Sequence, residues 1–246
     1  MDPRQNIIEK RLANINRLIA VASGKGGVGK SLIATTLALS LSKKGRKVGL
    51  LDLDFQGPSA HVILGLKNAY PKEEKGIVPP EVHGIRFMSI VYYVKDEPSP
   101  LRGTDVSNAI IELLAITQWK KLDFLVVDMP PGIGDQTLDL IRFMKGSEFL
   151  VTTTPSKVAL ETVKKLLKLL KELKIPIMGL IENIKMFPSS LAREQAKELS
   201  VPFLGEISFD RYLEEAIGNP NKLLETKFAR DLNVILSKTN LLYKSI

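Results

Sequence analysis

The 246-residue sequence contains no cysteine. Within these residues, disulfide bonds, thiolate nucleophiles, and zinc or iron–sulfur sites built on the chain's own thiolates are therefore excluded. Histidine is almost as scarce, since His61 and His83 are the two in the chain and do not show a metal-ligand spacing. We interpret both as ordinary surface or partly buried residues.

Long apolar runs are also lacking. No run approaches the roughly 18 residues that suggest a membrane-spanning helix. The first residues, MDPRQNIIEKR, are polar and charged, unlike a secretory signal peptide, so we expect a cytoplasmic protein. The sequence shows no flexible linker, and we expect one domain over residues 1–246 that starts with a short helix.

Basic residues exceed acidic ones. The 35 Lys and Arg against 27 Asp and Glu give a formal net charge of +8. This excess favours anionic partners such as nucleotides, nucleic acid or acidic lipid, and it does not choose among them.

The most informative stretch is the glycine-rich segment VASGKGGVGKS, residues 21–31. It matches the phosphate-loop pattern G-x-x-x-x-G-K-[ST], in which backbone N–H groups cradle phosphates. Lys30 is expected to reach the β- and γ-phosphates, and the Ser31 hydroxyl to bind Mg²⁺. The residues expected to contact the nucleotide are Gly24, Lys25, Gly26, Gly27, Val28, Gly29, Lys30, Ser31 and Leu32. Lys25 is a second lysine that the pattern does not require.

The surroundings of this segment fit a phosphate loop. An apolar run over residues 17–23 predicts a strand, residues 30–45 predict a helix, and residues 47–54 predict the next strand. Apolar strands continue to alternate with helices along the chain. The pattern predicts a doubly wound, mostly parallel α/β sheet with helices on both faces, the fold of the P-loop NTPases.

Acidic residues follow two of the expected strands. Asp128 ends the apolar run FLVVD, where a carboxylate beside a phosphate loop can support a metal ion. Asp52 and Asp54 lie in LLDLDFQGPS, and they face the same side if the strand continues through both.

The loop GKGGVGKS resembles the deviant Walker A loop of a class of dimeric nucleotide switches. This class includes Mrp-type iron–sulfur carriers, the nitrogenase iron protein, the arsenical pump ATPase, and the MinD and ParA ATPases. Later blocks resemble Mrp in particular: LLDLDFQGPS, LRG at 101–103, LDFLVVDMPPGIGDQTLDL, VTTTPSKVAL, IPIMGLIEN and GEISFDRYLEEA. The resemblance runs from about residue 12 to residue 220.

The resemblance implies roles for individual residues. It implies that Lys25 reaches the partner's nucleotide in an ATP-bound homodimer, so that hydrolysis is slow and coupled to dimerisation. Asp54 would position or activate the hydrolytic water, and Asp52 and Asp128 would lie close to Mg²⁺. Asn183, in LIEN, would bind the edge of the adenine. ATP or ADP and Mg²⁺ are the implied ligands.

The sequence departs from the Mrp pattern after the LIEN block. Mrp proteins usually have C-x-x-C there, whereas this chain reads ENIKMFPSSLAREQ. An iron–sulfur cluster is therefore doubtful on this chain, and the chain could serve a cysteine-bearing partner. Two other functions stay open: a MinD- or ParA-like positioning ATPase on membrane or DNA, and an adaptor that binds nucleotide without hydrolysis. The lysine-rich segment 157–174 is interpreted as a helix covering the sheet, and membrane or nucleic-acid binding through it or the C-terminal tail is disfavoured.

Overall fold

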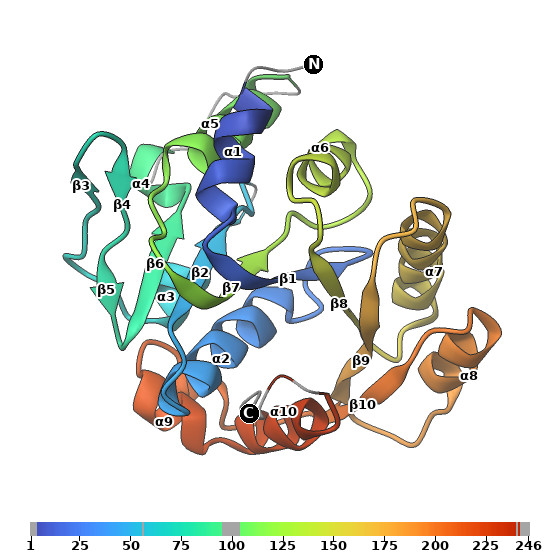
Figure 1. Ribbon diagram of the computed structural model, residues 1–246. Coiled ribbons are helices and arrows are strands. Elements are labelled where there is room, and N and C mark those ends of the chain that lie inside the picture. The colour runs from blue at the N-terminus through green and yellow to red at the C-terminus, as the bar shows by residue number, and fades with distance from the viewer. Residues whose placement is uncertain (1–3, 56, 95–103, 240, 242–246) are drawn as a thin grey trace.

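The computed structural model describes residues 4–55, 57–94, 104–239 and 241 (Figure 1). The LRG block at 101–103 and residues 242–246 of the tail lie outside them. The strands are β1 (Ile15–Ser23), β2 (Val48–Asp52), β3 (Lys72–Glu73), β4 (Ile77–Val78), β5 (Glu81–Val82), β6 (Ile85–Ser89), β7 (Leu122–Asp128), β8 (Glu148–Thr153), β9 (Ile177–Lys185) and β10 (Phe203–Ser208).

The main sheet has eight strands in the order β10-β9-β8-β1-β7-β2-β6-β5. All neighbours are parallel except β5 and β6, which form an antiparallel edge. The central strands are apolar and buried because helices cover both faces. Strands β3 and β4 form a separate two-stranded hairpin. The predicted doubly wound, mostly parallel sheet is thus confirmed.

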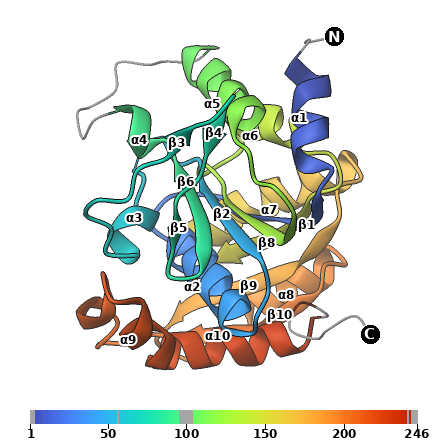
Figure 2. The same cartoon turned by 60° about the vertical axis from the view of Figure 1, so that its left-hand side comes forward.

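Helices form a layer on each face of the sheet (Figures 1 and 2). One layer contains α1 (Arg4–Leu12), α5 (Thr104–Ile116), α6 (Asp135–Phe143), α7 (Lys157–Glu172) and α8 (Leu191–Glu198), and the other contains α2 (Lys30–Lys43), α3 (Ala60–Ile63), α9 (Pro220–Glu225) and α10 (Lys227–Ser237). Two short helices complete the described elements, α4 (Val91–Val94) and η1 (Glu214–Ala216). Among the described residues, no helix is both long and apolar enough to cross a membrane.

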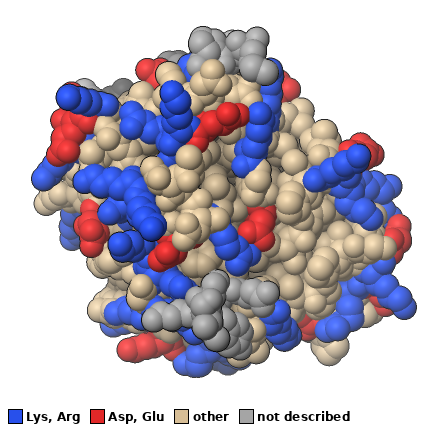
Figure 3. All heavy atoms as spheres, viewed as in Figure 1, with Lys and Arg blue, Asp and Glu red and all other residues tan. Residues whose placement is uncertain are grey.

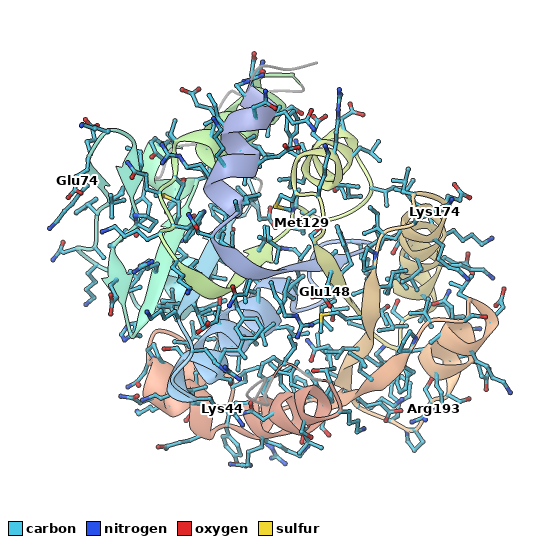
Figure 4. All side chains as sticks on the ribbon, in the orientation of Figure 1. Lys44, Glu74, Met129, Glu148, Lys174 and Arg193 are labelled. Carbon is cyan, nitrogen blue, oxygen red and sulfur yellow. The ribbon has the colours of Figure 1, made fainter. Side chains whose placement is uncertain are left out.

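The sheet order brings three carboxyl ends together at the centre of the molecule. Asp52 pairs with Asp128 in the register of β2 and β7, and Val21 of β1 pairs with Asp128 from the other side. Met129, which directly follows Asp128, lies in the middle of the molecule (Figure 4). The edge where β1, β2 and β7 end is the place where parallel α/β sheets bind ligands.

The second strand is shorter than the sequence predicts. It ends at Asp52, so Asp54 lies in the following loop and not on the strand. The prediction that Asp52 and Asp54 share one face of the strand is therefore wrong, because Asp54 is not part of the strand. The two residues are still joined, because the Asp54 backbone N–H donates to Asp52 Oδ1 at 3.1 Å.

Candidate functional site

The glycine loop lies between β1 and α2 and borders a cavity. Gly27 and Gly29 have φ angles of 77° and 84°, in the left-handed region that glycine adopts without strain. The cavity has a volume of about 260 Å³. It is lined by Ser23, Lys25, Gly26, Gly27, Gly29, Lys30, Ser31, Leu32, Asp54, Gly57, Ser59 and Ile63. The structure thus gathers most of the predicted loop residues and Asp54 around one cavity.

Lys30 lies at the centre of this site. Its ammonium is 2.5 Å from Asp128 Oδ1 and 3.4 Å from Asp54 Oδ2. It also lies 3.4 Å from the hydroxyl of Ser31. Lys30 is 5% exposed and Asp128 fully buried, so each needs the other's charge. A lysine from the glycine loop, the carboxylate at the end of β7 and a carboxylate from the loop after β2 therefore form one charged cluster beside the cavity.

The two strand-end carboxylates lie behind the cavity wall. Asp52 is fully buried and accepts hydrogen bonds from the backbone N–H groups of Asp54 at 3.1 Å and Ala60 at 3.3 Å. Burial, aided by the nearby charge of Asp128, raises the pKa of Asp52 to about 7. Burial also raises the pKa of Asp128, against the opposing effect of Lys30.

Asn183 is joined directly to the glycine loop. Its side-chain N–H donates to the carbonyl oxygen of Val28 at 2.9 Å. A Cβ at Gly29 would lie 2.2 Å from the Asn183 amide nitrogen, so this position has no room for a side chain. Asn183 is 3% exposed and does not line the cavity. The structure places it beneath the loop, and its contact with adenine stays a prediction.

Gly24 does not line the cavity, and instead allows α7 to pack closely against the glycine loop. A Cβ there would lie 2.4 Å from the backbone nitrogen of Val163 in α7. At Gly26, two residues along, a Cβ would meet nothing within 4 Å. The first glycine of the loop is therefore required by the approach of α7, which the sequence pattern does not show.

Lys25 lines the cavity and is partly exposed. Its backbone carbonyl accepts a hydrogen bond from the Ser23 hydroxyl at 2.9 Å, which fixes the loop at this point. Within the described part of the chain, its ammonium has no ion pair, in contrast to that of Lys30. Ser23 also binds the loop that follows β7, because its backbone carbonyl accepts a hydrogen bond from the Gly132 N–H at 2.9 Å.

Sequence reasoning missed four lining residues: Ser23, Gly57, Ser59 and Ile63. The last two come from α3 and the turn before it. A signal was present, because Gly57 and Ser59 follow Asp54 within five residues of sequence. It did not show that Gly57 and Ser59 lie beside the glycine loop.

The residues proposed for Mg²⁺ fit a partly hydrated cation. Ser31 lines the cavity, and the buried Oδ2 of Asp128 has no hydrogen-bond partner among the described residues. In that part of the chain, no three acidic or histidine side chains form a ready-made metal cluster. Mg²⁺ commonly keeps several waters and takes few protein ligands besides substrate phosphates, which agrees with this arrangement.

Known proteins resemble this chain over most of its length. A family model of the ParA group, described as NUBPL iron-transfer P-loop NTPase, matches residues 14–239. A protein of Methanocaldococcus jannaschii named iron-sulfur cluster carrier protein is 36% identical over 250 residues, covering 94% of this chain and 86% of that protein. A protein of the same name from Pseudomonas fragi is 42% identical over 177 residues, and the match spans 62% of its length.

Solved structures agree with the family match. A nucleotide-binding protein from Archaeoglobus fulgidus in complex with ADP is 30% identical, with a TM-score of 0.76, over 90% of this chain and 93% of that one. The cell division ATPase MinD of Pyrococcus furiosus shares the fold, with a TM-score of 0.70 at 23% identity over 93% and 100% of the two chains. The phosphate loop, the sheet order and these matches show that the chain belongs to the ParA family of P-loop NTPases, in the group described as NUBPL iron-transfer P-loop NTPases.

Proposed function

We propose that this chain is a Mg²⁺-dependent ATPase that acts as a slow, ATP-closed homodimeric switch in iron–sulfur cluster assembly or transfer. One observation carries the proposal. The Lys30 ammonium lies between Asp128 and Asp54 beside a cavity lined by the glycine loop. A cytoplasmic location and a single domain over the whole chain are parts of the same proposal.

Each residue of the site would have a separate role in the reaction. Backbone N–H groups of the loop and the Lys30 ammonium would bind the phosphates and balance their charge. Asp54 lines the cavity and would orient the water that attacks the terminal phosphorus and accept its proton. Ser31, with Asp52 and Asp128 behind it, would hold Mg²⁺. When bound, Mg²⁺ supplies positive charge to the phosphate oxygens.

Dimer closure is supported by the surface around the loop. Lys25, a partly exposed residue of the glycine loop, carries an ammonium without an ion pair in the described part of the chain. Two apolar side chains on neighbouring elements are exposed, Ile133 at 40% and Val158 at 64%. A second copy of the chain that covered them would bring its own Lys25 to this nucleotide, adding charge in the manner of an arginine finger.

The link to iron–sulfur chemistry rests on the family and needs a partner. The chain has no cysteine, and Met186, after β9, offers only a thioether, which is a poor cluster ligand. The residues do not fit a cluster held by this chain alone. We therefore propose that the cluster is cargo held by thiolates of a cysteine-bearing partner, while this chain supplies the nucleotide-driven step.

Phosphate release from ATP tests the enzymatic part. The wild-type protein should release phosphate slowly and only with Mg²⁺. Lys30→Ala should lose both nucleotide binding and hydrolysis, and Asp54→Asn should bind ATP yet hydrolyse it at least about 100-fold more slowly. Lys44→Ala, at the far end of α2 (Figure 4), is the matched control and should behave as wild type. Tight ATP binding without phosphate release at high protein concentration would instead identify a nucleotide-binding adaptor.

A positioning ATPase on membrane or DNA is the second candidate. Its support is the fold shared with MinD and the lysines of α7. However, the apolar face of α7 is buried against the sheet, and in Figure 3 basic and acidic side chains are interspersed on the visible face. Salt-sensitive, ATP-dependent sedimentation with anionic vesicles or DNA would favour this candidate over the first.

A further inference from the structure

The ammonium of Lys30 is surrounded by oxygens of the protein. A lysine ammonium has three N–H groups and no acceptor. Three side-chain oxygens lie within reach of it, namely Asp128 Oδ1 at 2.5 Å, Asp54 Oδ2 at 3.4 Å and Ser31 Oγ at 3.4 Å. Strand β2, which Asp54 follows, packs against α2, the helix that begins at Lys30 (Figure 2). A phosphate oxygen that binds this ammonium therefore has to displace at least one of the three.

Asp128 depends on Lys30 for its counter-charge. The side chain of Asp128 is fully buried, and that of Lys30 is 5% exposed. Within the described ranges, Lys30 is the one cation in an ion pair with Asp128, whose Oδ2 has no hydrogen-bond partner there. Removing one member of a buried ion pair leaves an uncompensated charge, which is strongly unfavourable. Withdrawal of Lys30 from Asp128 is therefore costly unless another cation takes its place.

A phosphate in the phosphate-loop cavity competes with these carboxylates for Lys30. Lys30 and Asp54 both line that cavity, so a phosphate there lies near the ammonium and near a negative charge. Binding of a nucleotide alone would add negative charge and at the same time draw Lys30 away from Asp128. Mg²⁺, when bound, supplies positive charge at the same place. Nucleotide and Mg²⁺ should therefore bind together far better than either binds alone.

We propose that Asp128 and Asp54 hold Lys30 in an autoinhibitory latch, which opens when a nucleotide and Mg²⁺ bind together. When the latch opens, Lys30 exchanges carboxylate oxygens for phosphate oxygens. The same exchange frees Asp54 for the attacking water, so hydrolysis does not begin before both ligands are in place. The latch rests on the proposed function, because it takes the phosphate-loop cavity as the nucleotide site.

The affinity for ADP without metal tests the latch. The Kd of a fluorescent ADP analogue is measured in EDTA and in Mg²⁺, with pyrophosphate as a competitor that lacks the base. The wild-type protein should bind the analogue about 100-fold more tightly with Mg²⁺. Asp128→Asn replaces the charge-assisted contact of Lys30 with a neutral one, so binding in EDTA should become about tenfold tighter. Binding in Mg²⁺ should not improve, so the effect of the metal becomes smaller.

Asp54→Asn and Asp135→Asn are the comparisons. Asp54 lies farther from the ammonium than Asp128 does, so the gain in EDTA should be smaller, about threefold. Asp135, exposed at the start of α6, does not line the cavity, and its variant should stay within about twofold of wild type. The gain of Asp128→Asn should be the same at about 0.1 M and about 0.5 M KCl, because a buried pair is little screened. A gain that salt abolishes is general charge repulsion and overturns the latch.

The contact between Lys30 and Asp128 is observed directly by NMR of protein labelled with ¹⁵N-lysine. Without nucleotide, the buried ammonium of Lys30 should give a separate signal that is absent from Lys30→Ala. Its chemical shift should change in Asp128→Asn, and also in wild-type protein with ADP and Mg²⁺, but not in Asp135→Asn. A signal that Asp128→Asn leaves unchanged overturns the latch.

The outcomes distinguish the latch from the proposed function. If ADP binds with Mg²⁺ and Asp128→Asn leaves the affinity in EDTA unchanged or lower, the latch fails and the proposed function stands. If neither ADP nor pyrophosphate binds under either condition, the proposed function fails, and with it the exchange of Lys30 between carboxylate and phosphate. The NMR signal then still decides whether Asp128 holds Lys30.

Discussion

The side-chain amide of Asn183 donates to the carbonyl oxygen of Val28 at 2.9 Å, which ties strand β9 to the phosphate loop across 155 residues of sequence. This bond makes the loop conformation depend on a strand outside the βαβ unit. Asn183→Ala leaves the Val28 carbonyl without its donor, so nucleotide affinity should fall by about tenfold. Titration with a fluorescent ADP analogue measures the loss.

Asn233→Ala is the matched control for this prediction. Asn233 is a partly buried asparagine on α10 that does not line the phosphate-loop cavity. Its removal should leave ADP affinity within about twofold of wild type. Equal losses in the two variants would mean that Asn183 acts through general stability and not through the loop.

Two glycines of the loop should respond differently to the same substitution. Gly24→Ala places a Cβ 2.4 Å from the backbone nitrogen of Val163, so either the loop or α7 has to move. We expect a loss of about 1–3 kcal/mol in the free energy of unfolding. Gly26→Ala meets nothing within 4 Å and should change that free energy by less than about 0.5 kcal/mol. Urea denaturation followed by circular dichroism compares them, and similar losses would contradict the packing role of Gly24.

Asp52 should make stability depend on pH. Its pKa is raised from 3.8 to about 7 in the folded protein, so the folded state holds a proton that the unfolded state has already released. Stability is therefore highest below the unfolded pKa and falls as the pH rises towards 7. The slope cannot exceed one proton, about 1.4 kcal/mol per pH unit.

Asp52→Asn should flatten this part of the pH profile. Urea denaturation between about pH 5 and pH 7 gives the slope for each protein. Asp105→Asn, at an exposed position on α5, is the control and should keep the wild-type slope. An unchanged slope in Asp52→Asn would show that other groups carry the dependence.

Much of the fold follows from local pattern, because buried strands are apolar and covering helices repeat their apolar residues at helical spacing. The phosphate loop can also be predicted from local sequence, since its glycines, Lys30 and Ser31 lie within eight consecutive residues, 24–31. The close approach of α7 to Gly24 and the contact of Lys30 with Asp128, 98 residues away, depend on tertiary packing. The end of β2 at Asp52 was missed because the apolar Leu53 makes the strand pattern look longer.

The action of Lys25 across a dimer can be tested by complementation. Lys25→Ala and Asp54→Asn should each bind ATP and each lose hydrolysis by at least about 100-fold. In a mixed dimer, one site keeps its own Asp54 and receives an intact Lys25 from the other copy. With random pairing, half of the dimers are mixed, so the mixture should regain about a quarter of the wild-type rate. No recovery, in dimers shown by differential tags to be mixed, would place Lys25 in its own subunit's site.

A measurement of iron binding distinguishes a chain that carries the cluster itself from one that assists a cysteine-bearing partner. After anaerobic reconstitution with iron and sulfide and subsequent desalting, the wild-type chain should retain no cluster spectrum, because it offers no thiolate. The double variant Met186→Cys/Ser189→Cys restores C-x-x-C spacing directly after β9, where Met186 is 62% exposed. It should hold iron shared between two copies, with ATP increasing the amount retained. Stoichiometric iron on the wild-type chain would overturn the assignment of the cluster to a partner, because ligands other than cysteine would then hold it.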